Sequence, residues 1–205
     1  MHNTTTPASD LLGQDEAADL LKPYVEAIRD CILKAWHQWE EFGQVLPEAR
    51  RALCARTRAN FLYDHICQAI IHRFDGVDGV SINTRRGFLM LNIRDRALVR
   101  FKKLDKNLHA SNIATYQQVR FTLQMELPGI PKGVTRLVAG YQLDRSQTAI
   151  SDMVVTQPYG NRLNWFYSIG TTGEIVRIQE ALPGPVPAPR VRAKRPMKDA
   201  SEAGS

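Results

Sequence analysis

The sequence predicts an α+β protein, in which an N-terminal antiparallel helix pair packs on a mostly antiparallel β-sheet of about 6–7 strands. Two patterns predict this class. Between residues 24 and 74, apolar side chains recur at steps of three and four, as on helices with one buried face. From residue 80 onward, apolar and polar side chains alternate in short runs separated by turn residues, as in antiparallel strands.

The 205 residues of the chain suit a single domain flanked by two tails. Residues 1–14 are polar and threonine-rich and are predicted to be a disordered leader. The domain is expected over residues 15–181, with its helical part over 15–75 and its sheet part over 80–180. Residues 182–205 open with a proline run, continue with basic residues and are predicted to be a disordered tail.

Proline and glycine divide the helical part. A first helix is expected to begin near Asp15 and to restart at Pro23, because proline is tolerated in the opening turn of a helix. The next helix spans residues 24–42, and Gly43 is expected to end it. A second long helix is predicted over residues 47–74, antiparallel to the preceding one and joined to it by a short loop.

The first half of the sheet is expected to start with a hairpin. Residues 80–83 and 88–93 are predicted strands around a turn at 84–87 whose glycine can take a positive φ. A third strand follows over residues 97–104. The segment 111–127 fits both a strand and a helix, and we favour a helix placed between two halves of the sheet.

The second half of the sheet is predicted to be a meander. The runs 135–143, 149–156 and 162–169 alternate in character, and a short run at 174–178 closes the series. The turn residues between these runs predict that each strand pairs antiparallel with the next.

Charge and cysteine content indicate the compartment in which the protein is expected. The net charge is +6, and the five basic and two acidic residues after residue 181 supply +3 of it. Three cysteines form an odd, unpatterned set, which fits a reducing compartment. No secretory signal and no bilayer-spanning apolar run are visible, so we expect a cytoplasmic protein of bacterial type without membrane contact.

A run of cations in the first half of the predicted sheet is the strongest functional signal. A hairpin that carries cations can contact phosphates. We therefore predict a non-catalytic binding module for nucleic acid or an acidic protein partner, with Arg85, Arg86, Arg100 and Lys102 on one exposed surface. The alternative is a sheet edge that lysine and arginine protect against edge pairing. The predicted contact residues are Arg85, Arg86, Arg94, Arg96, Arg100, Lys102, Lys103 and Lys106.

Catalytic signals are weaker. The spacings Cys-x-x-Cys and His-Glu-x-x-His, the Gly-x-Ser-x-Gly elbow and a phosphate loop are all missing from the sequence. No catalytic residue, cofactor or metal ligand is therefore predicted. An alternative function is a metal-dependent nuclease, in which Asp144, Asp152 and Glu174 hold a divalent ion that activates water.

A third class of function is an antitoxin-like interaction module that binds its partner through the long helices or an aromatic sheet face. Period-two alternation places Trp165 and Tyr167 on one face of their strand and Phe166 on the other. Core packing accounts for the first pair. If the opposite face is open, Phe166 is available to anchor a partner or to stack on a base.

Overall fold

A computed structural model of the chain describes residues 11–85, 87–110, 115–126 and 132–170. The side chain of Arg85 is not part of the description. The described ranges contain both helices and strands, which confirms the α+β class. Their elements in chain order are α1 (Gln14–Leu21), α2 (Val25–Val45), α3 (Pro47–Ala52), α4 (Ala55–Phe74), β1 (Val80–Arg85), β2 (Phe88–Ile93), β3 (Ala97–Lys103), α5 (Tyr116–Thr122), β4 (Thr135–Leu143), β5 (Ile150–Tyr159) and β6 (Arg162–Ser168).

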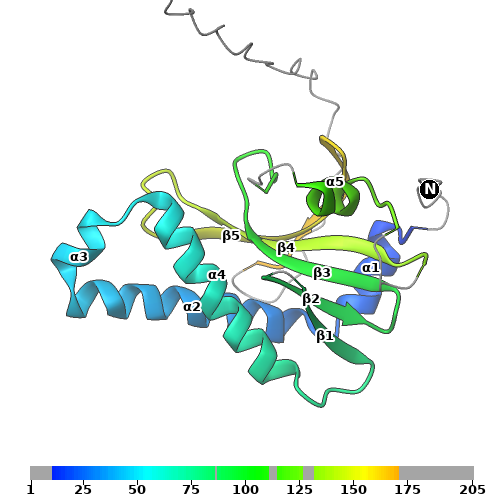
Figure 1. Cartoon of the computed structure of the whole chain (residues 1–205), viewed down its shortest axis with the longest axis horizontal. Helices are drawn as coiled ribbons and strands as arrows, with labels where there is room; N and C mark the ends of the chain where they lie inside the picture. Colours follow the sequence, from blue (N-terminus) through cyan, green and yellow to red (C-terminus); the bar gives the residue numbers. More distant parts are fainter. Residues whose placement is uncertain (1–10, 86, 111–114, 127–131, 171–205) are drawn as a thin grey trace, which may run out of the picture.

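The six strands form one mixed sheet in sequence order, from β1 at one edge to β6 at the other. Four of the neighbouring pairs are antiparallel, and the central pair of β3 and β4 is parallel. A parallel pair requires a crossover, and α5 lies in the connection that carries the chain back (Figure 1). The sheet therefore consists of two antiparallel halves that are joined by the parallel pairing of β3 with β4.

One face of the sheet is apolar and belongs to the main core. Strand residues such as Val99 and Phe101 share a buried cluster with Ile28 of α2 and with Ile66 and Ile70 of α4. Figure 1 shows α2 and α4 running beside each other, with α3 at the end that projects from the sheet. The apolar stripes seen in the sequence are the faces that these two helices bury.

The opposite face carries a smaller cluster under α5. Phe121 of α5 packs there with Met90, Leu98 and Val138, which come from three neighbouring strands. Phe166 is half-buried against the same cluster, while Tyr167 lies in the main core. The alternation predicted for this part of β6 is thus confirmed.

The prediction of one long helix over residues 47–74 is wrong. Leu53 and Cys54 are extended, with ψ of 134° and 164°, and they separate α3 from α4. No residue of α3 is buried, so no packing holds it in line with α4. Cys54 is the N-cap residue of α4, and its Sγ lies 3.3 Å from Thr57 Oγ1.

The prediction that Gly43 ends its helix is also wrong, because α2 continues to Val45. A Cβ at this position would lie 2.1 Å from Cδ of Arg50. Glycine is therefore present for close approach: it lets the Arg50 side chain lie against α2. This contact brings Arg50 to 5.2 Å from the ring centre of Trp39.

The ambiguous segment 111–127 contains a helix, α5, which confirms the favoured interpretation over Tyr116–Thr122. The capping residue is Thr115, whose hydroxyl accepts a hydrogen bond from Gln118 N at 3.2 Å. Gln118 and Phe121 of this short helix are buried. Its buried side is therefore part polar, unlike the sides that α2 and α4 bury.

The beginning of the described chain is attached to the sheet. Leu12 N donates to Thr135 Oγ1, and Trp165 Nε1 donates to the Leu12 carbonyl, so residues from 11 onward are fixed on the sheet. Residues 1–10 of the predicted leader, the run at 174–178 and the tail at 182–205 lie outside the described residues. None of the described helices is both long enough and apolar enough to span a bilayer.

Candidate anion-binding site

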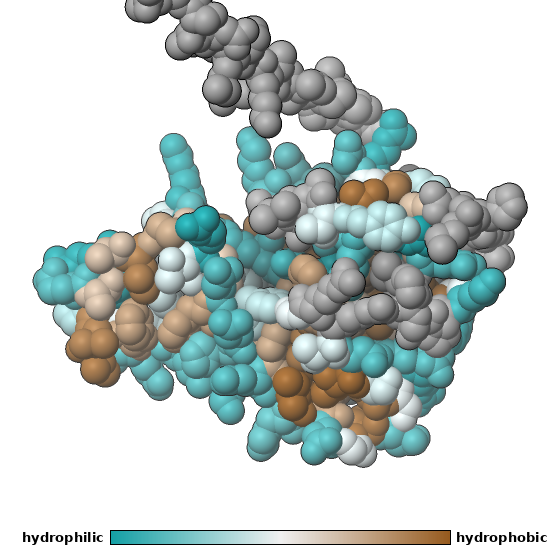
Figure 2. Space-filling model, viewed as in Figure 1, coloured by the Kyte–Doolittle hydropathy of each residue, from teal (hydrophilic) through white to brown (hydrophobic). Residues whose placement is uncertain are grey.

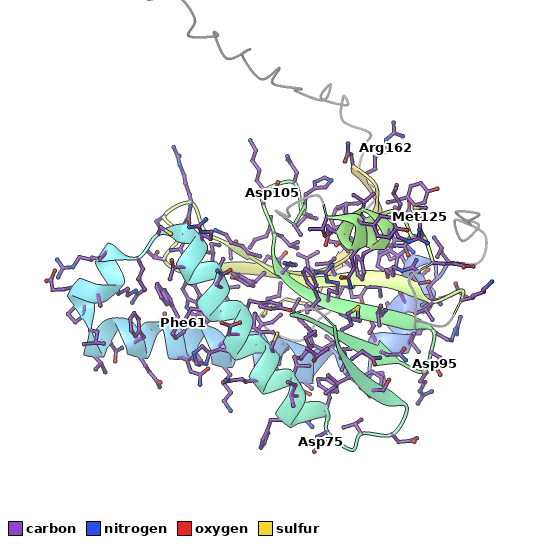
Figure 3. All side chains as sticks on the ribbon, in the orientation of Figure 1. Phe61, Asp75, Asp95, Asp105, Met125 and Arg162 are labelled. Carbon is purple, nitrogen blue, oxygen red and sulfur yellow. The ribbon has the colours of Figure 1, made fainter. Side chains whose placement is uncertain are left out.

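The described members of the predicted cationic set do not share one exposed surface. Asp95 and Asp105, labelled in Figure 3, mark the two ends of β3. Arg94 and Arg96 are exposed just before the start of β3. Arg96 Nη2 forms an ion pair with Glu16 Oε1 of α1 at 3.9 Å. The remaining members follow β3 toward its other end. Arg86 and the side chain of Arg85 lie outside the described part.

Arg100 is buried, with 4% of its surface exposed, which differs from the expectation that it is accessible. Its guanidinium carbon lies 4.4 Å from the ring centre of Phe88 and 4.8 Å from that of Phe121. Nη1 donates to Gln118 Oε1 at 2.6 Å. Nη2 has no hydrogen-bond partner in the described part of the chain. Arg100 is thus a buried cation held between two aromatic rings and one amide.

Lys102 is half-buried next to this arginine. Its Nζ lies 5.5 Å from the ring centre of Tyr63 on α4 and 5.8 Å from that of Phe88. The Tyr63 hydroxyl donates to the Gly87 carbonyl and accepts from Leu89 N, so it is fixed to the β1–β2 turn. Two rings and a turn therefore position Lys102 beside Arg100.

Arg58 and Lys103 form a second pair of cations, on the other side of β3. Arg58 Nη1 donates to the Gln147 carbonyl at 3.1 Å, and its Nη2 also contacts Gln147 Oε1. Lys103 Nζ lies 3.5 Å from the same Oε1. Lys106, in the loop after β3, is exposed. We call the residues along this α4–β3 contact the basic seam: Arg58, Tyr63, Arg100, Lys102 and Lys103.

The electrostatics of the basic seam are unusual because burial and like charges act together. Burial lowers the pKa of Arg100 to about 10, so it is still a cation at neutral pH. Burial, and then the neighbouring Arg100, lower the pKa of Lys102. Burial, and then Arg58, lower the pKa of Lys103. None of the seam cations forms an ion pair with another described residue.

A second buried arginine lies on the same face of the sheet. Arg136 of β4 is 1% exposed, and its Nε and Nη1 have no partner among the described residues. Burial, and then Arg120, lower its pKa to about 10, while Glu126 acts in the opposite direction. Gln124 binds the backbone beside it by accepting from Arg136 N and donating to the Arg136 carbonyl. The α5 face therefore buries two cations.

The carboxylates of the nuclease alternative are engaged in local hydrogen bonds. Asp144 accepts from Thr148 N and Ala149 N in the β4–β5 turn, where an Asp side chain commonly binds nearby backbone donors. Asp152 accepts from the Ser168 hydroxyl at 2.6 Å. Glu174 lies outside the described residues. Within the described ranges, no three His, Cys, Asp or Glu side chains gather as a candidate metal site.

Sequence reasoning did not include Arg58, Tyr63 or Gln118 in the site. The first is the only one with a signal in the sequence, since the beginning of the predicted long helix is rich in arginine and poor in apolar residues. The other two look like ordinary helix residues. Only the packing of α4 and α5 against β3 brings them to the cations.

The chain matches no protein-family model, and neither a curated protein nor a solved structure matches it at a significant level. Fold and site together define an α+β protein with a mixed six-stranded sheet in its described part and a cationic seam between a helix and a central strand.

Proposed function

We propose that this protein is a non-catalytic binding module of the bacterial cytoplasm that contacts nucleic acid through its basic hairpin region, with the basic seam at the centre of the contact. The helix pair of α2 and α4 is the scaffold, because α4 supplies Arg58 and Tyr63 to the seam. Lys106, which is exposed in the loop after β3, extends the contact beyond the seam.

The observation that carries this proposal is the burial of Arg100 and Lys102 without a carboxylate partner in the described chain. Taking a cation out of water costs free energy unless an anion or several acceptors compensate it. Two neighbouring cations add mutual repulsion to that cost. A phosphate bound at the half-buried Lys102 supplies the missing negative charge close to both cations.

We favour nucleic acid over an acidic protein because the cations lie on both sides of one strand and in the loop after it. Arg100 and Lys102 lie on one side of β3, Lys103 and Arg58 lie on the other, and Lys106 follows in the loop. A phosphate backbone presents many charges and can contact cations at separate places. The acidic-partner alternative remains an outcome of the test below.

The test is a fluorescence anisotropy titration of the full chain with labelled single- and double-stranded DNA and RNA over a series of salt concentrations. Each phosphate contact is expected to add about 0.7–0.9 to the slope of log affinity against log salt. Lys103→Met is expected to weaken binding and reduce the slope, whereas Arg162→Met is not. Arg162 is an exposed control cation at the start of β6, on the far edge strand.

Two other results would give the function to a different class. Binding of polyglutamate without binding of any nucleic acid would favour the acidic protein partner. Cleavage of the oligonucleotides only when magnesium is added, with loss of cleavage in Asp152→Asn, would favour the nuclease.

An interaction module is a second candidate because apolar residues are exposed at the projecting end of the helix pair. Val45 is 76% and Leu46 51% exposed, and Figure 2 shows apolar surface over this end of the molecule. If the protein is an interaction module, Val45→Asp should lose binding to its protein partner at every salt concentration, whereas Lys103→Met should bind that partner as well as the unsubstituted protein does.

A further inference from the structure

A small cavity lies where the end of α2, the helix α3 and the start of α4 meet. Its volume is about 240 Å³. Figure 1 shows that this is the end of the helix pair that projects from the sheet. The residues lining the cavity include Trp39, Arg50, Arg51, Leu53, Cys54 and Arg58. It therefore combines three guanidinium groups, an indole and a thiol.

The positive charge around this cavity exceeds the negative charge. Arg51 pairs with Glu48 at 2.6 Å, whereas Arg50 and Arg58 form no ion pair with a described residue. Arg50 lies over the Trp39 ring, and Arg58 binds the neutral Gln147. Two uncompensated cations at one cavity favour a ligand with negative charge.

Trp39 lines the cavity, although only 3% of the residue is exposed. The guanidinium carbon of Arg50 lies 5.2 Å from the centre of its ring. The indole therefore helps to position one of the two uncompensated cations at the cavity.

Cys54 is the reactive group at the cavity. It is exposed at the N-cap of α4, where the Thr57 hydroxyl lies 3.3 Å from Sγ. The hydrogen bond from the Thr57 side chain and those from the Thr57 and Arg56 backbone lower the pKa of this thiol to about 7. Burial raises the pKa of Cys31 to about 11 and also raises that of Cys67. Of the three cysteines, Cys54 is the one that is both exposed and has a lowered pKa, as a reactive thiolate requires.

We propose that Cys54 is a site of mixed-disulfide formation with acidic low-molecular-weight disulfides, which the surrounding arginines select. The Cys54 thiolate attacks one sulfur of the disulfide, a new S–S bond forms, and the old S–S bond breaks. The leaving thiolate takes the electron pair and is then protonated by water. The carboxylates of the retained half bind Arg50, Arg51 or Arg58.

The test compares three disulfides of different charge on the full chain: anionic oxidised glutathione, neutral hydroxyethyl disulfide and cationic cystamine. Intact-mass measurement and peptide mapping should find one adduct, on Cys54, that a reducing agent removes. Oxidised glutathione is expected to react at least about tenfold faster than cystamine at low salt, and added salt should reduce that ratio. The rate should rise as the pH increases through about 7.

Matched variants separate charge selection from simple exposure. Cys54→Ser is expected to abolish the adduct and Cys67→Ser to leave it unchanged. Arg50→Met should reduce the preference for oxidised glutathione over cystamine while hydroxyethyl disulfide still reacts. Adducts on Cys67, or equal rates for the three disulfides, would overturn the proposal.

One consequence rests on the proposed function. The retained glutathione half brings two carboxylates next to Arg58, which belongs to the basic seam, so the modified protein should bind nucleic acid more weakly and recover when reduced. The two ideas fail separately. An adduct on Cys54 in a protein that binds no nucleic acid would refute only the proposed function. Unmodified Cys54 in a protein that binds nucleic acid would refute only the disulfide site.

Discussion

The two faces of the sheet bury different kinds of side chain. The face toward α2 and α4 is a continuous apolar cluster, to which Ile28, Ile70 and Val99 belong. The face toward α5 has a smaller apolar cluster, beside which Arg100 and Arg136 are buried. The first face gains free energy from nearly every side chain that it buries. The second face loses part of its gain because it buries charges without carboxylate partners in the described chain.

This difference indicates where function should be sought. A chain under selection for stability alone would replace the uncompensated cations with apolar side chains of similar volume. Departures from consistent packing are expected at functional sites. The basic seam is such a departure, because it buries charge and not only neutral polar groups.

The largest expected effect comes from the apolar face. Ile70→Ala removes a side chain with no exposed surface and is expected to reduce the free energy of unfolding by about 2–5 kcal/mol, measured by urea denaturation. The folded fraction should keep its affinity for nucleic acid. A large loss of affinity in the folded variant would show that the two faces are not independent.

The second prediction concerns Arg100 and has the opposite sign for stability. Arg100→Met keeps an elongated side chain between Phe88 and Phe121 but removes the buried charge. The free energy of unfolding is expected to stay the same or to rise by up to about 4 kcal/mol, while nucleic-acid binding weakens. Loss of stability together with unchanged binding would assign Arg100 a structural role instead.

A third prediction uses the lowered pKa of Lys102. Burial and the nearby Arg100 make its ammonium lose a proton at a lower pH than an exposed lysine does. Because only the protonated form of Lys102 binds the anion, nucleic-acid affinity should begin to fall at a lower pH than it would at a site whose lysines have the ordinary pKa of 10.5. Lys102→Arg, which stays charged, should keep its affinity to a higher pH in anisotropy titrations.

The same shift affects stability with a defined sign. Between the lowered pKa of Lys102 and its ordinary value of 10.5, the unfolded chain binds more protons than the folded one. The free energy of unfolding should therefore rise with pH across this window. If the free energy of unfolding instead fell with pH in the unsubstituted protein, and this fall were absent from Lys102→Met, the burial of the Lys102 ammonium would be contradicted.

Much of the fold could be predicted because it depends on local pattern. The strand runs between residues 80 and 169 and the helix within 111–127 are present in the structure. The chain does start a new helix close to Pro23, but at Val25, so Pro23 lies before the helix and not in its opening turn. The break at Leu53 and Cys54 was missed because the arginine-rich stretch around it has no apolar period to interrupt. The parallel pairing of β3 with β4 was missed because it joins segments that are far apart in sequence.

The site was harder to predict for a physical reason. Alternation along β3 correctly separates Arg100 and Lys102 from Val99 and Phe101. It does not show that Phe121 of α5 and Phe88 of β2 enclose the guanidinium of Arg100. A period-two pattern assigns a residue to a face, and only the tertiary packing determines whether that face is covered.

The smallest effect is expected at Asp144, which is half-buried in the β4–β5 turn. The Ser146 hydroxyl, and then backbone and hydroxyl donors of Ala149 and Thr148, lower the pKa of its carboxyl to about 2. The carboxylate form therefore stabilises the β4–β5 turn above the ordinary pKa of 3.8, and this contribution is lost as the pH falls through about 2. Asp144→Asn should lower Tm slightly at neutral pH, and the difference should shrink on acidification. Because water reaches this turn, the substitution leaves no buried group without a partner, and the loss of stability should be small. A decrease in the free energy of unfolding as large as that of Ile70→Ala would contradict this and show that the β4–β5 turn contributes to the core of the fold.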